Sequence, residues 1–266
     1  MRQVRKTRVG AASSNRETPW ASLPLGETLR EIFRRLSAAH GPQHWWPADE
    51  PFEVMVGAIL TQSTAWANVA IAIRNLKTAH ALSPQAIGSL PAEELAALIR
   101  PSGYYTAKTR KLKALVSWVE DHGCELSRLF AETTAQLRQE LLAVYGIGEE
   151  TADSILLYAA GKPVFVIDAY TRRIVDRVGI RPEGNTYGDY QRLFLASLPP
   201  DVAMFNEYHA LFVEHGKRVC RETPACPKCC LQDICNYGMS VTSTESAAAQ
   251  DQEGKYTAKE GHADCA

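Results

Sequence analysis

A Gly-Ile-Gly tripeptide between two helical patterns constrains the fold of this chain more than any other feature. The apolar residues from Leu141 to Tyr145 have helical spacing, which stops at Gly146 and resumes after Gly148. Two glycines around one apolar residue predict a tight hairpin, because glycine tolerates positive φ and lets another backbone come close. The second helix then starts with free N–H groups and a positive dipole end, which suit a phosphate. The sequence therefore predicts a helix-hairpin-helix that meets a phosphate at Gly146 and Gly148.

Asp168 follows the hairpin by twenty residues, between the apolar run Val164 to Ile167 and a new helical pattern. Two interpretations stay open at this point: a functional carboxylate, or a surface residue that only caps the next helix. The run before it has the sole strand-like composition in the chain, and it is too short and isolated to imply a sheet. Helical spacing recurs elsewhere, so we predict an all-α fold with further helices at 25–39, 54–60, 64–72, 91–100, 106–120, 125–140, 185–197 and 201–219.

Composition and charge restrict how this protein could bind nucleic acid and where it could be located. The 266 residues carry a net charge of −1, so any contact with nucleic acid would have to be local rather than driven by a large positive field. Residues 1–22 are basic and polar, and 239–266 are acidic and poor in large apolar residues, so we expect a flexible arm and a disordered tail. No apolar run is long enough for a membrane span, and the basic N-terminus has no apolar core behind it. We therefore expect a cytoplasmic protein.

Four of the seven cysteines form a compact pattern, Cys220-x5-Cys226-x2-Cys229-x5-Cys235. In a chain without a secretory signal, four thiols within sixteen residues indicate metal ligands rather than disulfides. Structural zinc sites usually place two close pairs on either side of a longer spacer. A single pair flanked by two longer gaps instead winds one loop around a bulkier ligand, as an iron–sulfur cluster would require. Cys230 stays open as a substitute for Cys229.

The hairpin, the Gly161 and Pro163 loop, Asp168 and the four-cysteine loop, in that order, resemble the endonuclease III superfamily of DNA glycosylases. The resemblance covers about residues 25–238, and the first cysteine gap is one residue shorter than in the family. It implies a [4Fe–4S] cluster on the four cysteines. It also implies two helical domains, residues 46–162 with the hairpin and residues 23–45 plus 163–238 with the cluster, around a DNA-binding cleft.

The same resemblance implies a catalytic role for Asp168. Departure of a base builds positive charge on the sugar, which a nearby carboxylate stabilises while it orients or deprotonates the attacking water. Bifunctional members of the family use a lysine at the start of the second hairpin helix to form a Schiff base with the sugar. Glu150 stands at that position here and cannot form an imine. We therefore expect a monofunctional glycosylase, in which Glu150 supports the helix N-terminus or positions water or the base.

The segments around Trp46, Gln62 and Gly148 look like the bacterial 3-methyladenine DNA glycosylase branch of this superfamily. The resemblance implies that Trp46 and Pro47 line the base pocket and that Gln62 fills the gap left by a flipped nucleotide. A cationic alkylated base is a good leaving group and stacks on an aromatic face. Tryptophans before a buried helix are more often packing residues, and this alternative stays open.

The segment after Gly103 carries a run of bases that includes Lys108 and Lys111. Such a run is either a solvated helix face or a contact to backbone phosphates, and we assign Lys108 and Lys111 to DNA binding. The expected partner is double-stranded DNA with a damaged base, bound by a monomer in the nucleoid. The alternatives are a bifunctional enzyme for oxidised pyrimidines, an adenine glycosylase for mispairs, and a non-catalytic DNA-binding protein that kept the fold.

Overall fold

The computed structural model describes residues 23–241, and within this range the chain forms helices and no strand, which confirms the predicted all-α fold. The arm expected at residues 1–22 and most of the expected tail lie outside the described residues. The main helices are α1 (Leu25–His40), α2 (Pro51–Leu60), α3 (Trp66–Thr78), α4 (Pro84–Ser89), α5 (Ala92–Ile99), α6 (Tyr105–Asp121), α7 (Leu126–Ala131), α8 (Thr134–Ala143), α9 (Glu149–Ser154), α10 (Ala169–Val178), α11 (Tyr187–Leu195) and α12 (Val202–Arg218). None of the described helices is long and apolar enough to cross a membrane.

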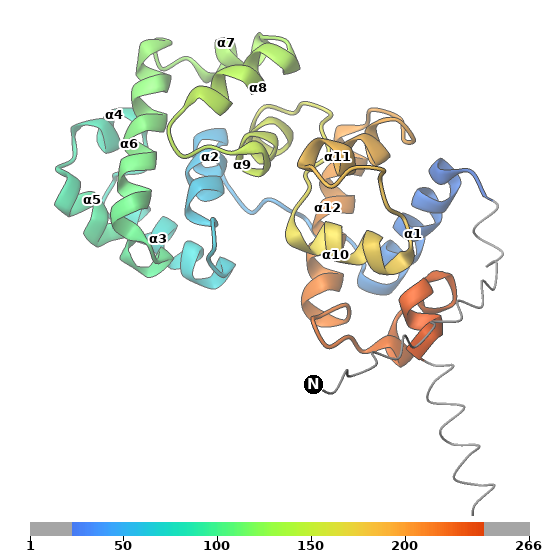
Figure 1. Ribbon diagram of the computed structural model, residues 1–266. Helices are drawn as coiled ribbons and strands as arrows, with labels where there is room; N and C mark the ends of the chain where they lie inside the picture. The colour runs from blue at the N-terminus through green and yellow to red at the C-terminus, as the bar shows by residue number, and fades with distance from the viewer. Residues whose placement is uncertain (1–22, 242–266) are drawn as a thin grey trace, which may run out of the picture.

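The helices gather in two groups along the molecule. Helices α3 to α8 lie at one end, whereas α1, α10, α11 and α12 lie at the other with the cysteine segment (Figure 1). Helices α2 and α9 lie between these groups (Figure 1). The chain passes from one group to the other before α2 and again after α9 (Figure 1). The domain boundaries at residues 46 and 162 stay a prediction.

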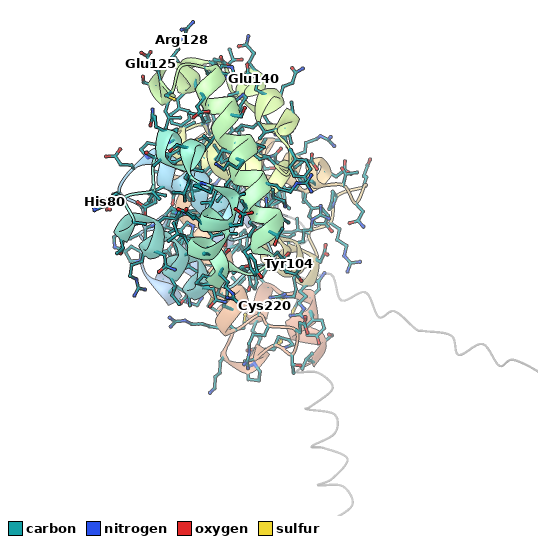
Figure 2. The ribbon with its side chains drawn as sticks, turned by 90° about the vertical axis from the view of Figure 1, so that its left-hand side faces the viewer. His80, Tyr104, Glu125, Arg128, Glu140 and Cys220 are labelled. Carbon is teal, nitrogen blue, oxygen red and sulfur yellow. The ribbon has the colours of Figure 1, made fainter. Side chains whose placement is uncertain are left out.

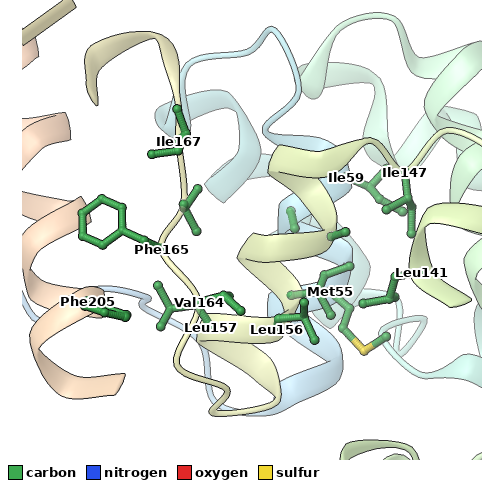
Figure 3. Close-up of a cluster of buried hydrophobic side chains, with 14 of the residues drawn as sticks. Met55, Ile59, Leu141, Ile147, Leu156, Leu157, Val164, Phe165, Ile167 and Phe205 are labelled. Carbon is green, nitrogen blue, oxygen red and sulfur yellow. The ribbon is translucent and has the colours of Figure 1, made fainter. Parts of the chain in front are cut away.

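Helix α2 lies in the centre of the core, as its apolar sequence predicted. Every residue from Phe52 to Leu60 is buried. Figure 3 shows Met55 and Ile59 of this helix beside Leu141, Ile147 and Leu156. Because these last three residues come from α8, the hairpin and the π-helical segment Ile155–Ala159 that continues α9, the core fixes the hairpin to the centre of the molecule.

The run from Val164 to Ile167 is extended and buried but pairs with no strand among the described residues. Its Phe165 ring stacks on Phe194 of α11 at a centroid distance of 3.8 Å. The same ring meets Phe205 of α12 edge-on at 5.3 Å, and Figure 3 shows these two residues. The strand-like composition therefore reflects burial between helices. This packing fixes the segment that leads into Asp168.

Three local predictions were wrong. Helix α3 runs from Trp66 to Thr78 rather than over the predicted 64–72, and no side chain caps its start. Thr64 instead donates its hydroxyl proton to the carbonyl of Ser102. The single helix predicted at 125–140 is two helices, because Thr133 accepts a hydrogen bond from Gln136 N–H at 3.3 Å and starts α8 anew. Residues 236–241 are helical, so the tail predicted from 239 overlaps ordered chain.

Candidate functional site: the hairpin and the acidic pair

The hairpin has the geometry that its glycines require. Gly146 has φ +85°, in the left-handed region that favours glycine, and Gly148 starts α9 in an extended conformation. Between them, Ile147 is buried and donates its N–H to Val144 O at 3.1 Å. A Cβ atom on Gly146 would overlap the side chain of Lys111, whereas one on Gly148 would meet nothing within 4 Å. The hairpin therefore packs against α6 at Gly146 and leaves Gly148 open.

Gln62 connects three elements at this place. Its Nε2 donates to Gly146 O at 3.0 Å and to Thr151 Oγ1 at 2.9 Å, and its Oε1 accepts from Lys111 Nζ at 2.5 Å. The amide therefore holds the end of α2 against the hairpin, α9 and α6. Of the residues assigned to DNA binding, the structure brings together Gln62, Gly146, Gly148 and Lys111.

Lys108 requires a correction. Its side chain is 2% exposed, and its Nζ donates to Leu60 O at 2.8 Å, Thr64 Oγ1 at 2.7 Å and Ser102 O at 2.7 Å. All three ammonium protons are thus used inside the protein, and no phosphate can reach them. Burial, with a smaller effect of Lys111, lowers the pKa of Lys108 to about 8. Lys108 is a structural residue that joins the loops after α2 and before α6.

Asp168 caps α10 and lies in a nearly closed environment. Its Oδ1 accepts the N–H of Thr171 at 2.7 Å, and its side chain is 12% exposed. Its Oδ2 lies 3.8 Å from Nε2 of His209 on α12. The capping interpretation is therefore correct for Oδ1, but the residue is not on the open surface. The cap fixes one carboxylate oxygen and leaves the other for chemistry.

Glu150 lies close enough to Asp168 for their charges to interact. Loss of hydration, together with the negative charge of Asp168, raises the pKa of Glu150 to about 7, and Arg172 opposes this shift. Glu150 is exposed as a residue. Because water partly reaches Glu150, burial alone raises its pKa less, and the negative charge of Asp168 contributes to the increase. The hairpin helix thus presents a carboxyl group near Asp168 that changes charge near neutral pH.

A network of buried polar groups fixes Asp168 relative to the hairpin. Asp153 of α9 is fully buried and accepts hydrogen bonds from Arg138 Nε and from Gln191 Nε2, both at 2.7 Å. Gln191 Nε2 also donates to Phe165 O at 2.8 Å. The hydroxyl of Tyr187 accepts the N–H of Ile167, the residue before Asp168, at 3.2 Å. The helix that carries Glu150 and the segment that carries Asp168 are therefore held in one framework.

Candidate functional site: the aromatic cluster

Aromatic rings lie next to the acidic pair. Trp46 lies between Trp66, at a centroid distance of 5.2 Å, and Tyr158, at 5.4 Å. A Cβ atom on Gly57 would lie 3.0 Å from Cζ2 of Trp46, so α2 and this indole come into close contact. Pro47 is exposed. The structure therefore puts Trp46 in an aromatic cluster, which is the packing that the alternative interpretation expected, with Pro47 at its exposed edge.

Sequence reasoning missed two residues here, Tyr158 and His209. Tyr158 Oη and His209 Nδ1 are 2.6 Å apart, and the same His209 faces Asp168. Their ring centroids are 5.9 Å apart. Tyr158 is near the hairpin in the sequence, but His209 is 41 positions after Asp168 on another helix. No sequence spacing could have joined them.

Tyr104 is a further exposed aromatic residue that sequence reasoning did not single out. It is 75% exposed, has a positive φ of 46° and precedes α6 (Figure 2). The Thr64–Ser102 hydrogen bond ties the loop before Tyr104 to the turn that carries Gln62. Its position directly after a Ser-Gly turn was the sequence feature that could have indicated an exposed ring.

Candidate functional site: the cysteine segment

The four cysteines of the pattern converge on one cavity. Cys220, Cys226, Cys229 and Cys235 all line this cavity, with Arg177 and Tyr237 beside them. Cys230 is not among the lining residues. The four thiols are a donor set that fits a metal cluster, with Cys229 rather than Cys230 lining the cavity.

Several donors point at these sulfurs. Leu231 N–H approaches Cys229 Sγ at 3.4 Å, Gly238 N–H approaches Cys235 Sγ at 3.4 Å, and Arg177 Nη1 approaches Cys220 Sγ at 3.4 Å. Donors of this kind stabilise thiolates that ligate iron. Burial raises the pKa of the Cys229 thiol to about 12, so this group stays protonated until a metal ion replaces its proton.

Candidate functional site: similar proteins

Comparison with known proteins gives the family. The family model for the HhH-GPD superfamily of base excision DNA repair proteins matches residues 56–200. A Methanocaldococcus jannaschii protein named as a DNA repair glycosylase is 42% identical over 212 residues, which are 79% of this chain and 96% of that protein. Endonuclease III of Thermotoga maritima is 27% identical over 80% of this chain and 92% of its own length.

Solved structures agree with this result. The H. pylori 3-methyladenine DNA glycosylase MagIII, solved with 1,N6-ethenoadenine, has a TM-score of 0.64 and 28% identity over 74% of this chain and 98% of its own. An endonuclease III–DNA complex has a TM-score of 0.72 at 21% identity over 83% of this chain and 100% of its own, and it bears on the fold alone. The chain belongs to the HhH-GPD superfamily of base excision DNA repair proteins, a family of DNA glycosylases.

Proposed function

We propose that the protein is a monofunctional DNA glycosylase that hydrolyses the N-glycosidic bond of flipped alkylated purines such as 3-methyladenine in double-stranded DNA. The observation that carries this proposal is the acidic pair of Glu150 and Asp168. By the resemblance, Glu150 stands where bifunctional members of the family have their nucleophilic lysine. A carboxylate cannot form a Schiff base with the sugar, so hydrolysis is the chemistry that remains.

Asp168 is the proposed catalytic residue. The N–H of Thr171 holds Oδ1, so the carboxylate has a fixed direction before the substrate arrives. Its low exposure strengthens the interaction with positive charge that develops on the sugar as the base departs. Oδ2 is free to orient or deprotonate the water that attacks the anomeric carbon.

Glu150 is the proposed partner of Asp168. With a pKa of about 7, it exchanges a proton at the pH at which a cell repairs its DNA. It can therefore hold the attacking water as an acceptor in one state and donate a hydrogen bond to the departing base in the other. A neutral Glu150 also avoids a second negative charge beside Asp168.

The proposed base pocket lies against Trp46 and Pro47. A methylated purine carries positive charge on its ring, and the face of an indole attracts such a ring by cation–π interaction and stacking. The similarity to the H. pylori glycosylase named for 3-methyladenine, at 28% identity, supports this substrate class. A charged base leaves without prior protonation, which agrees with a site built from two carboxyl groups.

The proposed DNA contacts are the Gly146–Gly148 hairpin, Lys111 and Gln62. The open backbone at Gly148 lets a phosphate approach, and Lys111 adds a positive charge beside it. Gln62 would exchange its hydrogen bond to the hairpin for contacts inside the duplex after the nucleotide has left the helix.

We also propose a [4Fe–4S] cluster on Cys220, Cys226, Cys229 and Cys235, which would hold the loop in shape. The monomeric state and the cytoplasmic, nucleoid-associated location stay predictions.

A panel of duplexes tests the proposal, each with one lesion: 3-methyladenine, 7-methylguanine, ethenoadenine, an oxidised pyrimidine or a mispaired adenine. We expect release of the alkylated purines and strand breakage only after alkali. Borohydride reduction during the reaction should trap no covalent protein–DNA adduct. A trapped adduct would contradict monofunctional hydrolysis and support the endonuclease III-type alternative, which the similarity to the Thermotoga maritima enzyme favours.

A further inference from the structure

A half-buried tyrosine and a buried histidine form a pair behind the acidic site. Tyr158 and His209 come from different parts of the chain, and their polar atoms are 2.6 Å apart. His209 is 7% exposed. Tyr158 also touches Trp46, at a ring distance of 5.4 Å, so the pair begins at the proposed base pocket and ends beside Asp168. The catalytic scheme above uses neither residue.

The hydrogen bond fixes the tautomer of His209. The phenol oxygen of Tyr158 carries one proton, and burial raises the pKa of this phenol well above its ordinary value. Burial also lowers the pKa of His209, against a smaller opposing effect of Asp168. Both groups are therefore neutral near pH 7. The phenol oxygen also lies 3.4 Å from Asn206 O, but its contact with Nδ1 is shorter, at 2.6 Å, so the phenol donates to Nδ1. The ring proton of a neutral imidazole must then be on Nε2.

That Nε2 atom is buried and has no hydrogen-bond partner within residues 23–241. A buried donor without an acceptor destabilises a protein, so such an atom calls for an explanation. Oδ2 of Asp168 lies 3.8 Å away, slightly too far for a hydrogen bond. The other charged groups that act on this pair are Lys217 and Glu207, both on α12.

We propose that His209 is a positioning residue for Asp168: its Nε2–H donates to Oδ2 when damaged DNA fills the site. With Thr171 holding Oδ1, the two bonds would fix the plane of the carboxylate toward the sugar. Tyr158 keeps the imidazole in the donating tautomer and links it to the wall of the base pocket. This inference rests on the proposed function, because it assigns a partner to the proposed catalytic carboxylate.

Two substitutions at one position test the role. His209→Met keeps a side chain of similar size but removes the donor, whereas His209→Gln can place an amide N–H near the position of Nε2. Under single-turnover conditions on a 3-methyladenine duplex, we expect His209→Met to slow base release about 10- to 100-fold, the value of one hydrogen bond to a charged group. We expect His209→Gln to recover most of the rate, and Tyr158→Phe to lie between. The affinity of each variant for a duplex with a tetrahydrofuran abasic analogue should stay within about threefold of the wild-type affinity.

A measurement on the wild-type protein covers the case in which a variant does not fold. In protein with ¹⁵N-labelled histidine, the Nε2 proton of His209 should move downfield on addition of the tetrahydrofuran duplex, and Asp168→Asn should reduce this shift. An unchanged resonance would overturn the proposal, as would a His209→Met variant with the wild-type rate of base release. If the wild-type protein released no base from any lesion, the proposed function itself would fail, which is a distinguishable result.

Discussion

Replacing Gly146 with alanine should destabilise the protein, whereas the same change at Gly148 should not. At φ +85°, an alanine at position 146 costs about 1–2 kcal/mol because its Cβ crowds its own backbone. The new methyl group also displaces Lys111, whose hydrogen bond to Gln62 contributes about 1 kcal/mol. The smaller entropy of an alanine in the unfolded chain offsets about 0.5 kcal/mol of this loss. The expected net loss is about 2 kcal/mol, or about 4–8 °C in Tm.

Gly148 is the matched control in the same hairpin. Its extended backbone accepts any residue, and nothing lies within 4 Å of an added Cβ. The poorer capping of α9 by alanine and the reduced entropy of the unfolded chain are each about 0.5 kcal/mol and oppose one another. We therefore expect Gly148→Ala to keep the free energy of unfolding within about 0.5 kcal/mol of the wild-type value.

Urea unfolding followed by circular dichroism measures both variants, and a tetrahydrofuran duplex measures their DNA affinity. If a phosphate approaches the backbone at Gly148, Gly148→Ala should weaken DNA binding about tenfold without loss of stability. Equal stability losses for the two variants, or none at Gly146, would refute the argument from backbone geometry. Unchanged DNA affinity for Gly148→Ala would refute the phosphate contact.

Three further predictions concern single side chains. Lys108→Met should lower the free energy of unfolding by about 3 kcal/mol, because it removes three buried hydrogen bonds from a charged donor, and should leave DNA affinity unchanged under folding conditions. Lys111→Met should instead weaken DNA affinity and reduce its salt dependence. Glu150→Gln should raise Tm more at pH 8 than at pH 5. The ordinary pKa of this carboxyl is 4.5 and its pKa in the folded protein is about 7, so between these pH values the folded protein holds a proton that the unfolded chain has lost. The wild-type carboxyl therefore lowers stability as pH rises, and glutamine removes this effect. Cys229→Ala should abolish the visible absorbance of a bound iron–sulfur cluster, whereas Cys230→Ala should retain it; the reverse would exchange their assignments.

Local patterns predicted much of this fold correctly, because they depend on neighbours in the sequence. The continuous apolar run of α2 could only be buried, and two glycines around Ile147 could only make a tight turn. The spacing of Cys226 and Cys229 likewise placed both on one loop, and the structure puts them on one cavity.

What the sequence could not predict depends on distant partners. Lys108 stands in a run of bases and looks like a phosphate ligand, yet its neighbours in space are carbonyl groups. His209 reaches Asp168 only because α12 packs against α10. The raised pKa of Glu150 likewise arises from burial and from a carboxylate eighteen residues away.

The role of Asp168 is tested most directly by Asp168→Asn, measured as base release from a 3-methyladenine duplex under single-turnover conditions. The asparagine oxygen can still accept the N–H of Thr171, so the cap of α10 is kept while the negative charge is lost. Asp201→Asn is the matched control, because Asp201 caps α12 through the N–H of Met204 in the same way. We predict a loss of at least about 100-fold for Asp168→Asn, unchanged affinity for the tetrahydrofuran duplex, and the wild-type rate for Asp201→Asn. Base release by Asp168→Asn at the wild-type rate would contradict the account.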